Sequence, residues 1–208
     1  MTEIILLSGG IESTTLLHIL HDQVELHAVF VDYGQRAADQ ESQAALAQCK
    51  VLGLTLFKLD MSSVGHAFRA GQSKKLHVPV PHRNLVVLSL GISYAAQLNA
   101  QRVNLAVNFE DTLAYPSASQ TFLDQFRALA QTLGAFDIAT PLIALSKPEI
   151  IQRGVELGID YRHTYSCLLG YDKHCGVCPQ CLHRRNAFNS AGVSEPENFY
   201  KSHSLTSS

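Results

Sequence analysis

The sequence lacks the features that mark membrane proteins, nucleic-acid-binding proteins and disordered chains. No stretch approaches the roughly 20 consecutive apolar residues that span a bilayer, and no internal repeat is present. Neither sign of charge dominates, since 16 basic and 18 acidic residues give a formal net charge of −2. What is abundant is apolar: 46% of the 208 residues are hydrophobic, enough to fill a sizeable core. We therefore expect one globular domain, or one domain with a small appendage.

Two further features indicate a reducing compartment. The start Met1-Thr2-Glu3 has no basic segment of the secretory type and leads straight into an apolar run. Of five cysteines, four cluster near the end of the chain at spacings typical of metal ligands. We expect a cytoplasmic protein that has no membrane partner.

Apolar runs of strand length alternate with helical patterns through most of the chain, which predicts an α/β fold with a parallel sheet covered on both faces. The predicted strands are Glu3–Leu7, Glu25–Val31, Thr55–Leu59, Arg102–Val107 and a shorter piece near Phe136–Ile138. The predicted helices are Ser13–Asp22, Arg36–Leu52, Asn84–Leu98, Ser119–Leu133 and, after a capping box at Ser146–Glu149, a helix to about Leu157. The polar stretch 60–82 has weak periodicity and is predicted to be a mobile loop near the site.

The first predicted strand ends in the small-residue turn Ser8-Gly9-Gly10, which opens a helix. Backbone N–H groups at such a helix start, together with the helix dipole, favour a phosphate. A Walker A loop would need a lysine after the glycines, and a dinucleotide fingerprint would need glycine in place of Ser13. Taken alone, the turn is equally compatible with an ordinary tight turn.

Cys167, Cys175, Cys178 and Cys181 offer four thiolates within a short segment. Such a set suits a closed tetrahedral site, which is typical of structural zinc. An iron–sulfur cluster is the main rival, because the last three cysteines resemble part of a ferredoxin run, although no further cysteine follows Cys181.

Several segments between these two motifs point to one family. They are DYGQR at 32–36, VPHRN at 80–84, Asp111 with Tyr115-Pro116, and Pro141-Leu142 followed by Ser146-Lys147-x-Glu149. With the SGGIES loop and the four cysteines, they resemble the 7-cyano-7-deazaguanine synthase (QueC) family. That family belongs to the N-type ATP pyrophosphatases, whose loop reads SGGxDS.

The resemblance implies a Rossmann-like fold of the adenine nucleotide alpha hydrolase type with a small helical zinc-binding region at the C-terminus. Residues 1–160 would form the ATP-binding domain and residues 161–208 the zinc-binding segment. ATP would adenylate the carboxylate of 7-carboxy-7-deazaguanine, ammonia would give the amide, and a second adenylation would give the nitrile. Mg²⁺, one structural Zn²⁺ per chain and a homodimer are implied as well.

The resemblance also assigns residues. The nucleotide would be held by Leu7, Ser8, Gly9, Gly10, Ile11, Glu12, Ser13, Thr14 and Asp32. Lys147, Arg83 and Asp111 would act in catalysis, and Cys167, Cys175, Cys178 and Cys181 would bind the metal.

Two departures from the family pattern concern the substrate. Glu12 replaces the family's aspartate, and Ser117-Ala118-Ser119 replaces Asp-Cys-Arg, so an acidic residue suited to a guanidine-like edge is missing. They suggest a divergent member, and leave open a ligase that joins the deazapurine carboxylate to another amine, such as a protein terminus. A tRNA-modifying pyrophosphatase is a third hypothesis, but the chain has no basic stripe, so nucleic acid is not an expected partner. A non-catalytic nucleotide binder is the last.

Overall fold

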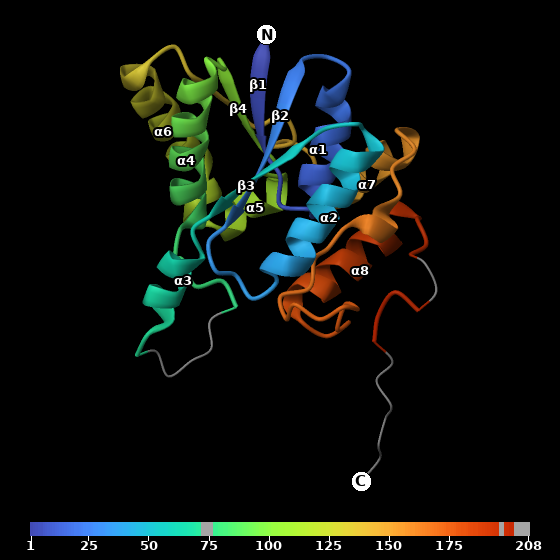
Figure 1. Cartoon of the computed structure of the whole chain (residues 1–208). Helices are drawn as coiled ribbons and strands as arrows, with labels where there is room; N and C mark the ends of the chain where they lie inside the picture. Colours follow the sequence, from blue (N-terminus) through green and yellow to red (C-terminus); the bar gives the residue numbers. More distant parts are fainter. Residues whose placement is uncertain (72–76, 196–197, 202–208) are drawn as a thin grey trace.

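A five-stranded parallel sheet forms the centre of the molecule in the computed structural model, which describes residues 1–71, 77–195 and 198–201 (Figure 1). The strand order is β3-β2-β1-β4-β5, and every neighbouring pair is parallel. The strands are β1 (Thr2–Leu6), β2 (Glu25–Asp32), β3 (Leu56–Asp60), β4 (Arg102–Leu105) and β5 (Asp137–Ala139). The predicted α/β class and all five predicted strands are confirmed.

Helices cover both faces of this sheet. On one side lie α1 (Ile11–His21), α2 (Ala38–Val51), α7 (Lys147–Glu156) and α8 (Pro179–Ala191); on the other lie α4 (Arg83–Leu98) and α6 (Gln120–Leu133). Alternate residues of β1 explain the two layers. Ile5 packs in the core that includes Leu17 of α1, whereas Ile4 packs in the core that includes Leu88 of α4. A strand buried on both faces is expected to be apolar, as this one is from Ile4 to Leu6.

The order of the strands fixes where a ligand can bind. The chain winds outward from β1 through β2 to β3, then returns to the other side of β1 to add β4 and β5. In open parallel sheets, the crevice at such a reversal, at the carboxyl ends of the strands, is the usual ligand site. Here that crevice lies beside the loop that follows β1.

The stretch 60–82, predicted as a loop, contains a helix, α3 (Ser62–Arg69), so this prediction was wrong for those residues. The Asp60 carboxylate accepts a hydrogen bond from the Ser62 N–H at 2.9 Å and starts the turn into the helix. Gly65 then packs so closely that an added Cβ would lie 2.1 Å from the Tyr33 carbonyl oxygen. This tertiary contact helps to hold a helix of only eight residues. Residues 72–76 of the same stretch lie outside the described residues.

Several other boundaries and elements differ from the prediction. Helix α1 begins two residues earlier than expected, because Gly10 is its N-cap. Helix α5 (Phe109–Ala114) was missed, although Asn108 and Asp111 form a complete capping box around its first turn. Two 3-10 turns, η1 (Pro116–Ala118) and η2 (Tyr161–His163), were also missed. None of the helices in the described ranges combines the length and apolarity needed to cross a bilayer.

Candidate active site and metal centre

A cavity of about 480 Å³ opens at the carboxyl ends of β1, β2 and β4. Its wall combines the loop after β1, the turn after β2, the start of α4, part of α5 and the first residue of α7. Segments from across the chain therefore meet where the topology places a ligand site.

The loop after β1 is shaped by one glycine that no other residue could replace without strain. Gly9 has a φ of 75°, and an added Cβ would lie 2.4 Å from the Glu41 carbonyl oxygen. The hydroxyls of Ser8 and Ser13 lie 3.0 Å apart, and the Ser8 N–H donates to Ser13 Oγ at 3.2 Å. The loop is thus closed by its own serines, and both serines line the cavity.

The structure brings only part of the expected nucleotide set to the cavity wall. Leu7, Ser8, Gly10, Glu12 and Ser13 line it. Gly9, Ile11, Thr14 and Asp32 do not: Ile11 and Thr14 are buried in the body of α1, and Asp32 Oδ1 accepts a hydrogen bond from the Gly34 N–H at 2.9 Å. Contact of any of the nine residues with ATP stays a prediction.

Glu12 and Lys147 form an ion pair inside the cavity. Lys147 Nζ lies 2.5 Å from Glu12 Oε1, and Asn108 Nδ2 donates to the same oxygen at 3.1 Å. Burial opposes ionisation of Glu12, but the attraction of Lys147 and the hydrogen bonds outweigh it, so the pKa of Glu12 is lowered. Burial likewise opposes the charge on Lys147, yet Glu12 raises the pKa of Lys147. Both groups are therefore charged at neutral pH.

Asp111 and Arg83, the other two predicted catalytic residues, also line this cavity. Asp111 accepts from the Asn108 N–H as part of the α5 capping box, and burial followed by repulsion from Glu12 raises the pKa of Asp111. The Arg83 guanidinium lies 5.8 Å from the centre of the Tyr115 ring. Together with Glu12 and Lys147, these residues place two cations and two carboxylates within reach of a ligand.

Sequence reasoning missed other residues of the wall. Glu41 lies in the first turns of α2, and Gln35 precedes that helix. Tyr165, Ser166 and Gln180 come from the cysteine segment. Gln35 belongs to the DYGQR motif and was within reach of sequence reasoning, whereas Glu41 lies in no motif considered there.

Ser117, which takes the place of the family's aspartate, is not part of the wall. It is buried in η1, where its carbonyl accepts a hydrogen bond from Asn84 Nδ2 at 3.0 Å. The carboxylate missing from this segment is therefore not replaced by the serine hydroxyl.

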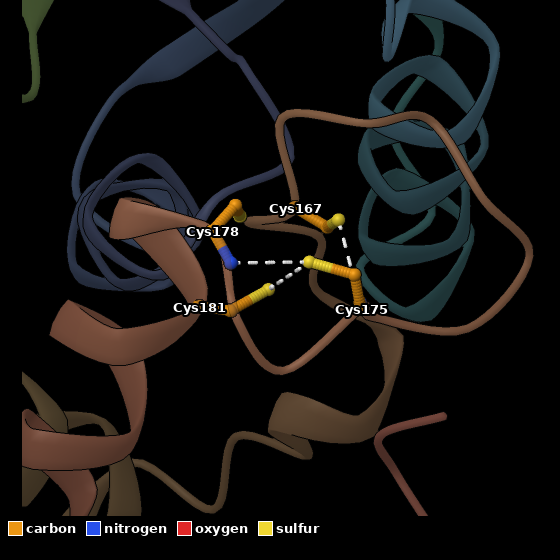
Figure 2. Close-up of side chains that lie close together, drawn as sticks. All are labelled: Cys167, Cys175, Cys178 and Cys181. Carbon is orange, nitrogen blue, oxygen red and sulfur yellow. Dashed lines mark hydrogen bonds between the residues drawn. The ribbon is translucent and has the colours of Figure 1, made fainter. Parts of the chain in front are cut away.

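The four cysteines converge on one point. Cys167, Cys175, Cys178 and Cys181 are buried, and their four Sγ atoms all lie within 4.8 Å of one another (Figure 2). Cys175 Sγ and Cys181 Sγ are 3.8 Å apart. A tetrahedral zinc with Zn–S bonds of about 2.3 Å requires S–S edges of about 3.8 Å, so this separation suits the ion. By its donors and geometry, the cluster could hold a metal ion.

Backbone amides favour the thiolate form of one of these sulfurs, that of Cys175. The N–H groups of Val177 and Cys178 donate to Cys175 Sγ at 3.4 and 3.2 Å. Burial opposes ionisation, but these hydrogen bonds outweigh it and lower the pKa of Cys175 to about 7. His174 accepts a hydrogen bond from the Ser166 N–H, at 2.9 Å, and is not one of the clustered groups.

The cysteine segment is tied to the phosphate loop and to the body of the domain. The Tyr165 N–H donates to the Gly9 carbonyl oxygen at 2.9 Å. Arg184 of α8 is 1% exposed; it donates to Thr164 Oγ1 at 2.8 Å and pairs with Glu195 Oε1 at 2.6 Å. A buried, fully paired arginine fixes the segment that carries Tyr165 and Ser166.

Comparison with known proteins agrees with this arrangement. The model of the family described as queuosine biosynthesis protein QueC matches residues 2–192. The chain belongs to the QueC family. A 7-cyano-7-deazaguanine synthase of Methanothermobacter thermautotrophicus is 33% identical over 220 residues, which cover 96% of this chain and 99% of that protein. One of Alcanivorax borkumensis is 36% identical over 219 residues, covering 94% and 98%. The predicted family is confirmed.

Solved structures support the fold alone. An NMN synthetase from Francisella tularensis aligns with a TM-score of 0.59 at 19% identity, covering 95% of this chain and 79% of the other. An NH₃-dependent NAD synthetase from Campylobacter jejuni aligns with a TM-score of 0.57 at 18% identity, covering 94% and 88%. This chain thus shares its sheet architecture with proteins that carry other names.

Proposed function

We propose that this QueC family member is a 7-cyano-7-deazaguanine synthase, an ATP-dependent ligase that converts 7-carboxy-7-deazaguanine and ammonia into the nitrile. The observation that carries the proposal is the similarity over nearly the full length to synthases of that name. The cavity supports it, because a phosphate-type loop, the cations Lys147 and Arg83, and three carboxylates line one space.

The reaction sets the demands on the site. A carboxylate oxygen attacks the α-phosphorus of ATP, the bond to pyrophosphate breaks, and an acyl-adenylate forms. The ammonia lone pair then attacks the acyl carbon; AMP leaves and the nitrogen loses a proton, which gives the amide. The amide oxygen is adenylated in turn, and loss of AMP and of the N–H protons gives the nitrile. Each phosphoryl step needs in-line alignment and neutralisation of phosphate charge more than acid–base chemistry.

The chain's own residues can meet these demands. Backbone N–H groups at the start of α1, with the hydroxyls of Ser8 and Ser13, would bind the pyrophosphate. Lys147 and Arg83 would offset negative charge that develops on the transferred phosphoryl group. Their assignment follows from position: both side chains line the same cavity as the loop.

Two metals fit the residues present. The carboxylates of Glu12 and Asp111 are oxygen ligands of the kind Mg²⁺ prefers, and they would hold the ion at the phosphates, where it neutralises charge. The four clustered thiolates would hold one structural Zn²⁺ per chain. The division into an ATP-binding part, 1–160, and a zinc-binding part, 161–208, belongs to the same proposal. It describes roles and not separate cores, because Phe188 packs in one cluster with Ile150 and Leu17.

A single assay tests the function. The purified chain is incubated with Mg-ATP, 7-carboxy-7-deazaguanine and ammonia, and AMP, amide and nitrile are followed by mass spectrometry. We expect two AMP per nitrile, with the amide as an intermediate. Reactions without ammonia and without the deazaguanine serve as controls. AMP release that depends on a protein amine, with no nitrile from ammonia, would show the ligase alternative instead.

Assembly and compartment are part of the proposal. We propose a homodimer, which light scattering of the purified chain would test. A cytoplasmic location suits a site that needs ATP and reduced thiolates.

A further inference from the structure

One carboxylate of the cavity lacks the partners that hold the others. Glu12 is paired with Lys147, and Asp111 caps α5. Glu41 Oε2 accepts a single hydrogen bond, from Gln35 Nε2 at 3.0 Å, and no further hydrogen bond or ion pair reaches this carboxylate from the described residues. A carboxylate at a cavity wall with acceptor capacity to spare is suited to a ligand that brings N–H or O–H donors.

The position of Glu41 is built by its surroundings. Gln35 Oε1 accepts from the Tyr33 N–H at 2.9 Å, and Gln35 Nε2 also donates to the Val31 carbonyl at 3.3 Å, so the amide has one orientation. The Glu41 backbone packs against Gly9 of the phosphate loop. The carboxylate is therefore held between the phosphate loop and the turn that follows β2.

The Glu41 carboxylate and the Arg83 guanidinium on the cavity wall suit a ligand that has hydrogen-bond donors at one end and an anionic group at the other. Burial raises the pKa of Glu41; hydrogen bonding by Gln35 and the field of Arg83 lower it only in part. Arg83 lies on the same wall and forms no ion pair within the described part of the chain. A molecule that carries an anionic group at one end and paired N–H donors at the other would satisfy both residues.

We propose that Glu41 binds the amidine edge of the deazaguanine, accepting from the ring N1–H and the exocyclic 2-amino group. This inference rests on the proposed function. Two parallel N–H donors match the two oxygens of a carboxylate, as in bidentate arginine pairs, and adenine offers no such donor pair. Glu41 then supplies the acidic group that Ser117 does not, from a different element of the fold.

Calorimetric binding to the full chain tests this directly, with Mg²⁺ and a non-hydrolysable ATP analogue present. The ligands are 7-carboxy-7-deazaguanine and the same compound without its 2-amino group. The wild-type chain should bind the first about 10- to 100-fold more tightly, as expected for hydrogen bonds to a charged group. Glu41→Gln should remove most of that preference, because an amide presents one donor and one acceptor in place of two acceptors.

The controls separate Glu41 from general effects. Asp39→Asn removes an exposed acid from the first turn of the same helix and should leave the preference intact. The Glu41→Gln variant should fold, because its new amide oxygen can still accept the hydrogen bond from Gln35. The wild-type measurement needs no variant: equal affinity for the two ligands would overturn the proposal.

Other outcomes also decide between explanations. If Glu41→Gln weakens binding of the ATP analogue and leaves the 2-amino preference intact, the carboxylate binds the paired hydroxyls of ribose and the proposal is wrong. If the wild-type chain binds the deazaguanine with the stated preference yet forms no AMP, the proposed function fails and the assignment of Glu41 stands. If it binds neither deazaguanine, both are overturned.

Discussion

Lys147 Nζ lies 2.5 Å from Glu12 Oε1, so the first residue of α7 is joined to the first turn of α1 across the cavity. The lysine is thereby held at the phosphate loop before any nucleotide arrives. The longer side chain of glutamate, where the family's pattern has aspartate, accepts both Lys147 and Asn108 at one oxygen. The departure at position 12 thus has a structural role of its own.

Glu12→Gln should destabilise the fold by about 1–3 kcal/mol at pH 7, because Lys147 would be left charged and largely buried without its partner. Urea unfolding of the variant and of the wild type measures the difference. Glu156→Gln, at the exposed end of α7, is the control and should leave the free energy of unfolding nearly unchanged. Equal free energies of unfolding for wild type and Glu12→Gln would contradict a stabilising ion pair.

The same pair predicts a pH dependence. The lowered pKa of Glu12 contributes stability that is present above its unfolded value, near 4.3, and is lost as pH falls through the folded pKa. The raised pKa of Lys147 contributes stability below about pH 10.4 that is lost as pH rises through its folded pKa. The stability difference between wild type and Glu12→Gln should therefore be largest between about pH 5 and pH 10. If the difference in the free energy of unfolding between wild type and Glu12→Gln grew below pH 4, the predicted pH dependence would be wrong.

Lys147→Met should lower kcat for AMP formation by about 10²- to 10³-fold, because a cation positioned at developing phosphate charge is lost. Lys147→Arg should retain part of the activity, since it keeps the charge with a different shape. Steady-state kinetics with Lys50→Met as control, an exposed lysine in the last turn of α2, checks the result. A kcat within a few-fold of wild type would remove Lys147 from the catalytic set.

Gly9→Ala should cost about 3 kcal/mol or more, because it adds left-handed strain to a clash with the Glu41 carbonyl oxygen. Gly53→Ala is the matched control: Gly53 has a φ of 68°, but an added Cβ would meet nothing within 4 Å, so only about 1 kcal/mol is expected. Thermal and urea unfolding of the two variants separate strain from clash. Similar losses in both would mean that the contact with α2 is unimportant.

Metal analysis of the purified chain should find one zinc per chain and no visible absorbance. Cys181→Ser should lose the metal and with it nucleotide-dependent activity, because Gln180 and Ser166 of the cavity wall belong to the segment that the metal closes. Cys49→Ala should keep the metal, since Cys49 is buried on the core-facing side of α2 and lies outside the cluster. Stoichiometric iron would instead support the iron–sulfur alternative.

Local patterns in the sequence were enough to predict some parts of the molecule. The apolar run before Ser8 marks a strand buried on both faces, and the spacing of the four cysteines marks a shared site. Sequence reasoning predicted neither helix α3 nor the position of Glu41 in the cavity wall. The packing of α3 and the placement of Glu41 depend on contacts between segments that local patterns do not reveal, such as Gly65 against Tyr33 and α2 against Gly9.

The hydrogen bond from the Tyr165 N–H to the Gly9 carbonyl oxygen joins a segment made early in translation to one made late. The ribosome makes the phosphate loop long before the wall that faces it, because that wall emerges only with the cysteine segment. A nascent chain therefore carries the loop without the wall that encloses the cavity, and we expect it not to cleave ATP. We expect a full-length chain without metal at the four cysteines to be inactive for the same reason. Only chains that are fully synthesised and carry the metal would then cleave ATP.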